Sequence, residues 1–374
     1  MRAGWHGQAQ PTWIDVDGQT YGAKPDVAGP IGGGAGYADP VARGDHHVGT
    51  VDELLAVLDR VREGQIILVD PAAELDFTDR VLAQAPFALR IPSGVTVAGG
   101  RGAPGAGDEG AAAGALLSSD EFKTQPLIEV TGPGARITGF RLRGPDPKRR
   151  LAFHHRVFHE GQGGHETYYR FPASTALRCE VPQLELGGRP WGVEIDNCEI
   201  SGWSRAGVFL LGGYGHQVHH CFIHHCQRMG LGYGICLDAA AATIHHNMFQ
   251  DNKHHIAGTG RPGTSYEAAH NVVLPPTESH IWDGQPYGQD HLFDMHGGED
   301  RGDGTTIAGT RLHVHHNSFL SAYPAVVISG VPEREAVVER NWLCHASASD
   351  AFRVRAGAVI RDNAYGPPPA PRRE

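Results

Sequence analysis

Residues suited to acid–base or metal chemistry are concentrated in the middle of the chain. Of its 24 histidines, 20 lie between His154 and His316. Imidazole changes its charge near neutral pH and also binds metal ions. The least ordinary pair is Asp294 and His296, two residues apart. A carboxylate beside an imidazole can orient the ring for proton transfer or share a metal ion with it.

Together with Arg261, Tyr266 and His270, this pair could carry out one kind of proton-transfer reaction. Abstracting a proton next to a carboxylate needs a base, a cation that stabilises the enediolate, and an acid on the opposite face. His296 or Tyr266 could be the base, and Arg261 could be the cation. We therefore expect a catalytic centre made of the following five residues: His296, Asp294, Tyr266, Arg261 and His270.

The same region could instead hold a divalent metal. A site with two or three histidines and one carboxylate suits Zn, Mn, Fe or Cu, and the candidate ligands are His270, His280, Asp294, His296 and His255, with His254 as an alternative to His255. The acidic segment 298–304 could hold Ca²⁺, although it lacks the DxDxDG spacing of an EF-hand. No HExxH, GxSxG, Walker A or Rossmann motif competes with these interpretations.

A repeat of about 24 residues must position these side chains. Alternating apolar and polar residues, followed by Asn or a small residue and an apolar pair, recur in seven segments: Val193–Ile200, Val218–Ile223, Ile244–Phe249, Ala269–Val273, Val314–Phe319, Val338–Leu343 and Ile360–Tyr365. The register residues are 197, 221, 247, 271, 317, 341 and 363. A unit of this size cannot bury its inward face alone, so the units must stack on one another.

Stacked units of this kind predict an all-β parallel β-helix. The chain resembles the right-handed parallel β-helix proteins of the pectate-lyase-like superfamily, whose bacterial members carry similar Ile-His-His-Asn repeats. The resemblance covers about residues 48–365. It implies a single-stranded right-handed parallel β-helix with loop insertions. It also implies that the amphipathic segment between Thr50 and Gly64 is a helix that caps the first coil.

A second, local resemblance concerns residues 294–296. The Asp-x-His spacing is similar to the Asp-Pro-His motif of mannuronan C5-epimerases, with Met295 in place of Pro. In that family His and Tyr transfer the proton at C5, while Asp and Arg bind the uronate carboxylate. This resemblance implies epimerase or lyase chemistry on an acidic sugar.

The spacing of the repeat also predicts how the chain is organised. Residues 1–47 are expected to form an extended arm, 48–365 the β-helix, and 366–374 a frayed tail. Insertions at about 145–190 and 275–304 should form loops on one functional face. By alignment, Asp294 takes the inward position that other coils fill with aliphatic residues: Leu210, Leu237, Ile328 and Val354. A buried carboxylate there would need a partner.

Paired histidines recur at one position of successive coils: His219 and His220, His245 and His246, and His315 and His316. Because neighbouring strands lie ~4.8 Å apart, their rings should stack. Such a stack can serve packing alone, or bring two or three imidazoles to one ion. We favour packing.

Composition limits the partners. The net charge of −10 opposes nucleic acid. No apolar run reaches the ~18 residues of a membrane span, and the first residues lack a signal-peptide core, which indicates a cytoplasmic protein, or a secreted one if this is a mature form. The six cysteines lack disulfide or zinc spacing, so we expect reduced thiols.

Three functions therefore remain. The leading hypothesis is a carbohydrate-active enzyme with lyase or epimerase chemistry on a polar or acidic glycan or sugar-derived metabolite. The alternatives are a metal-dependent enzyme with His and Asp ligands, whose substrate the sequence does not indicate, and a non-catalytic glycan-binding or scaffold protein.

Overall fold

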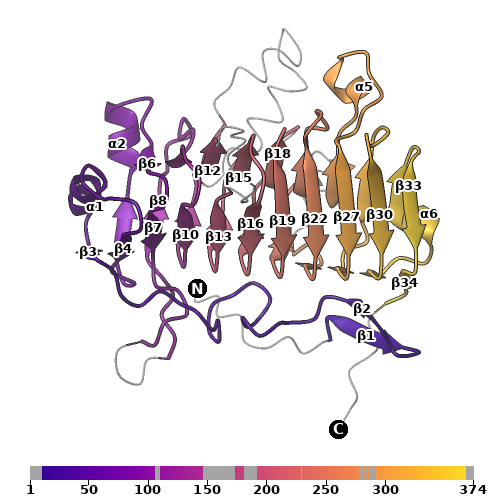
Figure 1. Cartoon of the computed structure of the whole chain (residues 1–374), viewed down its shortest axis with the longest axis horizontal. Helices are drawn as coiled ribbons and strands as arrows, with labels where there is room; N and C mark the ends of the chain where they lie inside the picture. Colours follow the sequence, from indigo (N-terminus) through magenta and orange to yellow (C-terminus); the bar gives the residue numbers. More distant parts are fainter. Residues whose placement is uncertain are drawn as a thin grey trace.

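The computed structural model describes residues 11–105, 110–145, 173–180, 192–228, 230–277, 281–282, 285–286 and 291–367. In this part of the chain, three parallel sheets run side by side along one axis (Figure 1). Successive strands enter the three sheets in turn, so each coil of the chain adds one strand to each sheet. The predicted parallel β-helix is therefore present.

Sheet 1 contains β3 (His46–Val48), β4 (Ile66–Val69), β7 (Thr96–Ala98), β10 (Arg136–Thr138), β13 (Glu194–Asp196), β16 (His216–His219), β19 (Ala241–His245), β22 (Ser265–Ala269), β27 (Arg311–His315), β30 (Glu335–Glu339) and β33 (Ala358–Arg361). Sheet 2 contains β5 (Glu74–Asp76), β8 (Leu116–Ser118), β11 (Arg141–Arg143), β14 (Glu199–Ser201), β17 (Phe222–His224), β20 (Met248–Gln250), β23 (Val272–Val273), β28 (Ser318–Phe319), β31 (Trp342–Leu343) and β34 (Ala364–Tyr365). Sheet 3 contains β6 (Leu89–Ile91), β9 (Ile128–Val130), β12 (Thr175–Glu180), β15 (Ala206–Leu211), β18 (Tyr233–Asp238), β21 (His254–Gly258), β26 (Phe293–Met295), β29 (Val326–Ile328) and β32 (Phe352–Val354).

The core is a column of aliphatic side chains stacked from coil to coil. In sheet 1, one inward row places Ile195, Val218, Ile244, Ala268 and Val314 in register, and all five are fully buried. Burial of apolar surface contributes roughly 25 cal/mol per Å². Because each coil buries its inward face only against its neighbours, the stack depends on keeping this register.

The corner between sheets 1 and 2 corrects the alignment of the first repeat. Asp196 pairs with His219, so Asn197 is equivalent to His220, not to Cys221 as predicted. Asn197 and His220 both have left-handed backbones, with φ of 53° and 50°. Asn tolerates this conformation better than most residues. This explains why Asn197 resembled the Asn residues that lie one position later in other coils. Those residues hydrogen-bond one another from coil to coil and form what we call the Asn ladder: Asn247, Asn271, Asn317, Asn341 and Asn363.

The amphipathic segment that begins after Thr50 forms helix α1 (Val51–Leu58), with Thr50 and Glu53 making a capping box. The helix ends before the predicted Gly64, because the chain turns where the N–H groups of Arg60 and Val61 both donate to the carbonyl of Val57. Its buried side chains join the core, and it contacts β3 and β6. Shorter helices are α2 (Thr78–Ala83), α5 (Gly298–Arg301) and α6 (Ala348–Ala351).

The segment before β3 lies along the outside of the stack (Figure 1). It starts with the hairpin of β1 (Trp13–Val16) and β2 (Gln19–Gly22), which contacts β28 and β31. The chain then runs back to β3, which pairs with β4. The amide of Gly32 donates to the carbonyl of His246 (2.9 Å), and the amide of Gly34 donates to Asn197 Oδ1 (2.7 Å). We call residues 23–38 of this segment the strap.

Both predicted insertions contain regular strands. Residues 173–180 supply β12, which pairs with β9 and β15, and residues 293–295 supply β26, which pairs with β21 and β29. The second insertion also carries α5 and the hairpin of β24 (Ile281–Trp282) and β25 (Gln285–Pro286). The rest of the first insertion lies mostly outside the described residues.

All six cysteines are unpaired. Within the described ranges, no helix combines the length and apolar character that a membrane crossing requires.

Candidate functional site

Asp294 lies on the outer row of sheet 3, so its predicted inward position was wrong by one residue. It pairs with Ala257 and Val327, whereas Met295 pairs with Gly258 and Ile328 and points into the core. A Cβ atom at Gly258 would lie 2.5 Å from Met295 Sδ, so Gly258 makes room for this larger side chain. Asp294 is nevertheless only 1% exposed. A carboxylate buried on the outer face needs partners as much as one in the core.

Three imidazoles surround this carboxylate. Asp294 Oδ2 lies 3.2 Å from His291 Nε2 and 3.1 Å from His296 Nε2. The ring of His254 stacks on that of His291, with centroids 4.2 Å apart. Burial alone would raise the pKa of Asp294, but the nearby imidazoles, His296 above all, bring it below its usual value. The group is therefore ionised at neutral pH. We call these four residues the Asp294 cluster.

The hydrogen bonds of His254 define its tautomer. Its Nδ1 lies 3.1 Å from the carbonyl oxygen of His291, so Nδ1 carries the proton and donates it. The lone pair is then on Nε2. Burial, and then the neighbouring His291, lower the pKa of His254 to about 3. This ring is therefore neutral at pH 7.

Several atoms of the cluster lack hydrogen bonds. Asp294 Oδ1, Asp294 Oδ2 and His291 Nε2 are buried and make no hydrogen bond of good geometry with the described residues. His291 Nε2 and Asp294 Oδ2 are 3.2 Å apart, close enough for an ion pair, but their angles do not fit a hydrogen bond. Buried polar groups in native proteins nearly always have partners. The cluster therefore has unused capacity for a ligand.

His296 forms the solvent side of the cluster. Its side chain is 31% exposed, and its Nδ1 lies 3.4 Å from Asp300 Oδ2 on α5. The same oxygen of Asp300 accepts from the amide of Gly297 (3.1 Å), which fixes its position. His296 thus stands between two carboxylates, one buried and one exposed. This arrangement can hold an imidazole ring in one orientation while it takes up and releases a proton.

Two of the predicted catalytic residues, Tyr266 and Arg261, are not part of the Asp294 cluster. Tyr266 is in the core, and its hydroxyl donates to the main-chain carbonyl of Asp294 (3.2 Å). Burial, and then the charge of Asp294, raise the pKa of Tyr266 well above its usual value, so the hydroxyl keeps its proton. Arg261 is exposed, and its guanidinium pairs with Asp238 Oδ2 at 3.1 Å.

Other predicted residues are not in the cluster. His270 sits at the corner between sheets 1 and 2 and stacks on His246, with centroids 4.9 Å apart. His255 is fully buried, and its Nδ1 bonds the side-chain amide of Asn252 (3.0 Å). His280 lies outside the described residues. The structure therefore unites Asp294 and His296 with His254 and His291.

His291 was missed as a partner because the sequence analysis assigned it to an insertion loop. The sequence feature that could have identified His291 is its position three residues before Asp294, on the coil next to that of His254. The ring of His254 stacks in turn on that of Tyr233, one strand earlier (5.6 Å). The sequence thus contained a repeated ring at this position, Tyr233, His254 and His291, from which the stacking could have been predicted.

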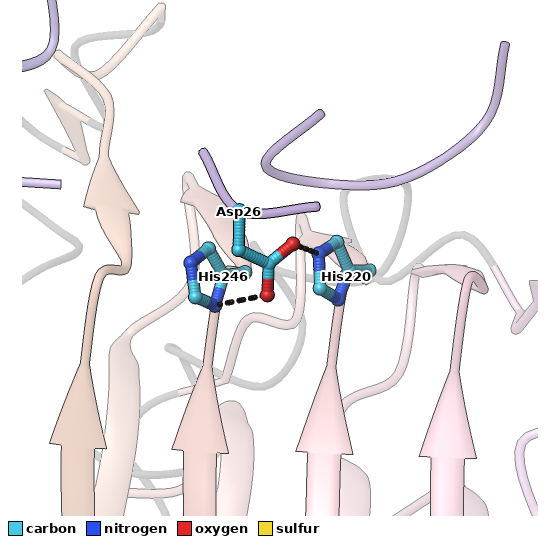
Figure 2. A group of neighbouring side chains, drawn as sticks. All are labelled: Asp26, His220 and His246. Carbon is cyan, nitrogen blue, oxygen red and sulfur yellow. Dashed lines mark hydrogen bonds and ion pairs between the residues drawn. The ribbon is translucent and has the colours of Figure 1, made fainter. Parts of the chain in front are cut away.

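Two of the paired histidines, His220 and His246, form a separate cluster with Asp26 (Figure 2). Asp26 of the strap lies 3.1 Å from His220 Nε2 and 3.6 Å from His246 Nδ1. The remaining nitrogens are also used, because the Nδ1 atoms of His219 and His220 lie 3.0 Å apart and His246 Nε2 donates to the carbonyl of Lys24 (3.1 Å). The stacked rings therefore contact one another and the strap, and their role in packing stays a prediction.

Comparison with known proteins identifies the architecture. A family model described as a right handed beta helix region matches residues 186–343. The protein is a right-handed parallel β-helix. Among solved structures, it is similar to an alginate lyase from Paenibacillus sp. str. FPU-7 (11% identity, 86% of this chain and 97% of that one, TM-score 0.42). It is also similar to pectate lyase Pel9A (11%, 83% and 72%, 0.44) and to the Dettilon tailspike protein (9%, 83% and 64%, 0.34). No curated protein matches the sequence.

In this β-helix, the Asp294 cluster is open on one side. Along the outer row of sheet 3, Ala257, Cys236 and Phe209 follow Asp294 in register, and all are buried. Exposure increases instead along the chain after Asp294, through His296 and into α5, where Glu299 and Asp300 are exposed. A molecule entering the cluster from solvent would therefore meet His296 first.

Proposed function

We propose that the protein is a carbohydrate-active enzyme that transfers a proton at the Asp294 cluster, by lyase or epimerase chemistry on a polar or acidic glycan or a sugar-derived metabolite. The observation that carries the proposal is the position of His296, partly exposed and held between Asp294 (3.1 Å) and Asp300 (3.4 Å).

The geometry supports His296 as the base. In the neutral ring Nδ1–H donates to Asp300 Oδ2 (3.4 Å), so the lone pair is on Nε2, which can take a proton from the carbon next to a substrate carboxylate. The imidazolium that forms lies between two carboxylates, which stabilise its charge. In an epimerase a proton returns to the opposite face of the carbon. In a lyase the C–H electron pair becomes a C=C bond and the glycosidic oxygen leaves with a proton from an acid.

The Asp-x-His resemblance supports an acidic sugar as the substrate. Mannuronan C5-epimerases carry this spacing, and in the present chain the two side chains face each other from the end of one strand. Tyr266 is not available as the second proton-transfer group, because its hydroxyl is committed to the core. The acid on the opposite face must therefore come from another residue or from water.

Proton exchange at a sugar carbon is the direct test. The wild-type chain is incubated in deuterated water with a panel of polyuronates and acidic oligosaccharides. Exchange is followed by NMR, and unsaturated products by their ultraviolet absorbance. We expect His296→Ala to lower kcat by about 10²–10⁴-fold, the usual contribution of a general base. Its melting temperature should change little, because the ring is partly exposed.

The matched control is His313→Ala, which removes a partly exposed imidazole from sheet 1. This variant should keep wild-type activity. The proposal fails if no acidic sugar exchanges or is cleaved, or if His296→Ala and His313→Ala behave alike. The second result would favour a binding or scaffold role.

A further inference from the structure

We propose that His254, His291 and Asp294 bind one divalent first-row transition metal ion, with His296 beside it as an outer group. The inference deepens the proposed function, on which it rests for the role of the ion. Its test is metal binding, which can succeed or fail independently of turnover.

The donor atoms have the spacing of a metal site. One ligand atom from each of the three residues lies within 4.8 Å of the other two. Two ligands bound to one ion at 2.0–2.2 Å with tetrahedral angles lie about 3.3–3.6 Å apart. His291 Nε2 and Asp294 Oδ2 are already 3.2 Å apart. Small side-chain rotations would thus place all three around one ion.

The unused atoms point to a cation. Both oxygens of Asp294 and His291 Nε2 are buried without hydrogen bonds to the described residues. A metal ion would satisfy the carboxylate and the imidazole lone pair together. His254 is prepared for the same role, because its Nδ1–H is held by the carbonyl of His291 and its Nε2 lone pair remains. Metal-binding histidines usually have their other nitrogen fixed in this way.

The cluster around Asp26 differs in this respect. His220 and His246 also lie near a carboxylate, but their ring nitrogens bond Asp26, the paired histidines and the strap carbonyl of Lys24. No lone pair of His246 is left for an ion. Imidazoles near a carboxylate are therefore not enough to indicate a metal site. The Asp294 cluster is the better candidate because its buried oxygen and nitrogen atoms lack hydrogen-bond partners.

Donor type sets the class of ion. Two imidazoles and one carboxylate suit Zn²⁺, Mn²⁺, Fe²⁺ or Co²⁺, whereas Ca²⁺ and Mg²⁺ prefer oxygen ligands. Three protein ligands leave coordination positions open, which is typical of catalytic rather than structural sites. Within the proposed function, the ion would supply the positive charge that stabilises an enediolate.

Cobalt titration of the chelator-treated full chain tests the inference. We expect uptake of one Co²⁺ per chain, with the visible absorption of a low-coordinate site, and competition by Zn²⁺. His291→Ala should weaken this binding at least 100-fold, and so should Asp294→Asn, which keeps the shape of the side chain. Metal should also raise the melting temperature of the wild type but not of these variants.

The control again is His313→Ala, because Glu267, His313 and His315 form another group of potential ligands. It should bind like the wild type. The inference is overturned if the wild type binds no stoichiometric metal, or if His291→Ala and Asp294→Asn, shown to be folded by circular dichroism, bind as the wild type does. Binding without any activity on acidic sugars would overturn the proposed function alone. If metal-free protein keeps its activity on acidic sugars, the ion does not take part in that reaction.

Discussion

Asn271 illustrates how a single side chain joins neighbouring coils. Its amide Nδ2 donates to the carbonyl of Ile244 (2.8 Å) and to Asn317 Oδ1 (2.9 Å). Its Oδ1 accepts from the main-chain amide and the side-chain amide of Asn247, both at 3.0 Å. The residue is fully buried. Removal of the side chain would leave several buried groups without partners, and each such group costs about 1–3 kcal/mol.

We therefore predict that Asn271→Ala lowers the free energy of unfolding by about 2–4 kcal/mol. Asn363→Ala is the matched control, since Asn363 is the last member of the same ladder and is only partly buried. Water can reach the groups that this change exposes, so its cost should be less than half as large. Equilibrium urea denaturation measures both values. Equal losses would show that the ladder bonds carry little of the energy.

At the scale of elements, the strap is held by contacts with several coils. Besides the bond of Gly34 to Asn197, the hydroxyl of Tyr37 donates to Asp196 Oδ2 (2.9 Å). Asp26 contacts both His220 and His246 (Figure 2). Because this carboxylate contacts two coils at once, we expect it to fix the strap to the stack.

Asp26→Ala should release the strap. The change leaves buried His220 Nε2 without its partner, which should cost about 1–3 kcal/mol. Limited proteolysis should then cut residues 23–38 several-fold faster than in the wild type. Asp39→Ala serves as the control, because Asp39 lies just beyond the strap and its side chain is 83% exposed. Unchanged proteolysis in Asp26→Ala would mean that the main-chain bonds alone hold the strap.

The coils were predictable because each one repeats the same local pattern. Alternation identified the inward rows of sheet 1, such as Val218, Ile244 and Val314, without any knowledge of distant contacts. Register was less predictable. A one-residue slip moves a side chain to the other face of a strand, and the insertion before Asp294 removed the constant spacing on which the alignment depended.

The candidate site was predicted in part for the same reason. Asp294 and His296 are unusual among the residues of their own coil, so the local sequence identified them. Their partner His254 lies 40 residues away, and the pairing of β21 with β26 brings it close. The position of the strap had no sequence signal either, since contacts such as Gly34 with Asn197 join segments 163 residues apart.

At the scale of the whole molecule, the histidines set a common response to acid. Burial, as the largest cause, lowers the pKa of His246, His270 and His316 to about 4. It lowers the pKa of His254 and His255 to about 3. An imidazole in an unfolded chain has a pKa of about 6.5. Between these values the unfolded state binds more protons than the folded state.

The sign of the pH dependence follows from this difference. The stability that these neutral imidazoles provide is complete above about pH 6.5, and it is lost as the pH falls toward their folded pKa values. Each imidazole that titrates fully only in the unfolded state contributes a slope of about 1.4 kcal/mol per pH unit. We predict a free energy of unfolding that is nearly constant from pH 7 to 8 and drops by several kcal/mol between pH 6 and 4.5.

Urea denaturation across this range tests the prediction, and variants assign the slope. His246→Asn should reduce the slope by about 1.4 kcal/mol per pH unit, because it removes one of the protons that only the unfolded chain takes up. His47→Asn, at an exposed position of β3, should leave the slope unchanged. Constant stability from pH 7 to 4.5 would contradict the prediction, since it would require the buried rings to accept protons as readily as those of the unfolded chain. The stacked imidazoles would then have to be hydrated in solution, and packing could not be their role.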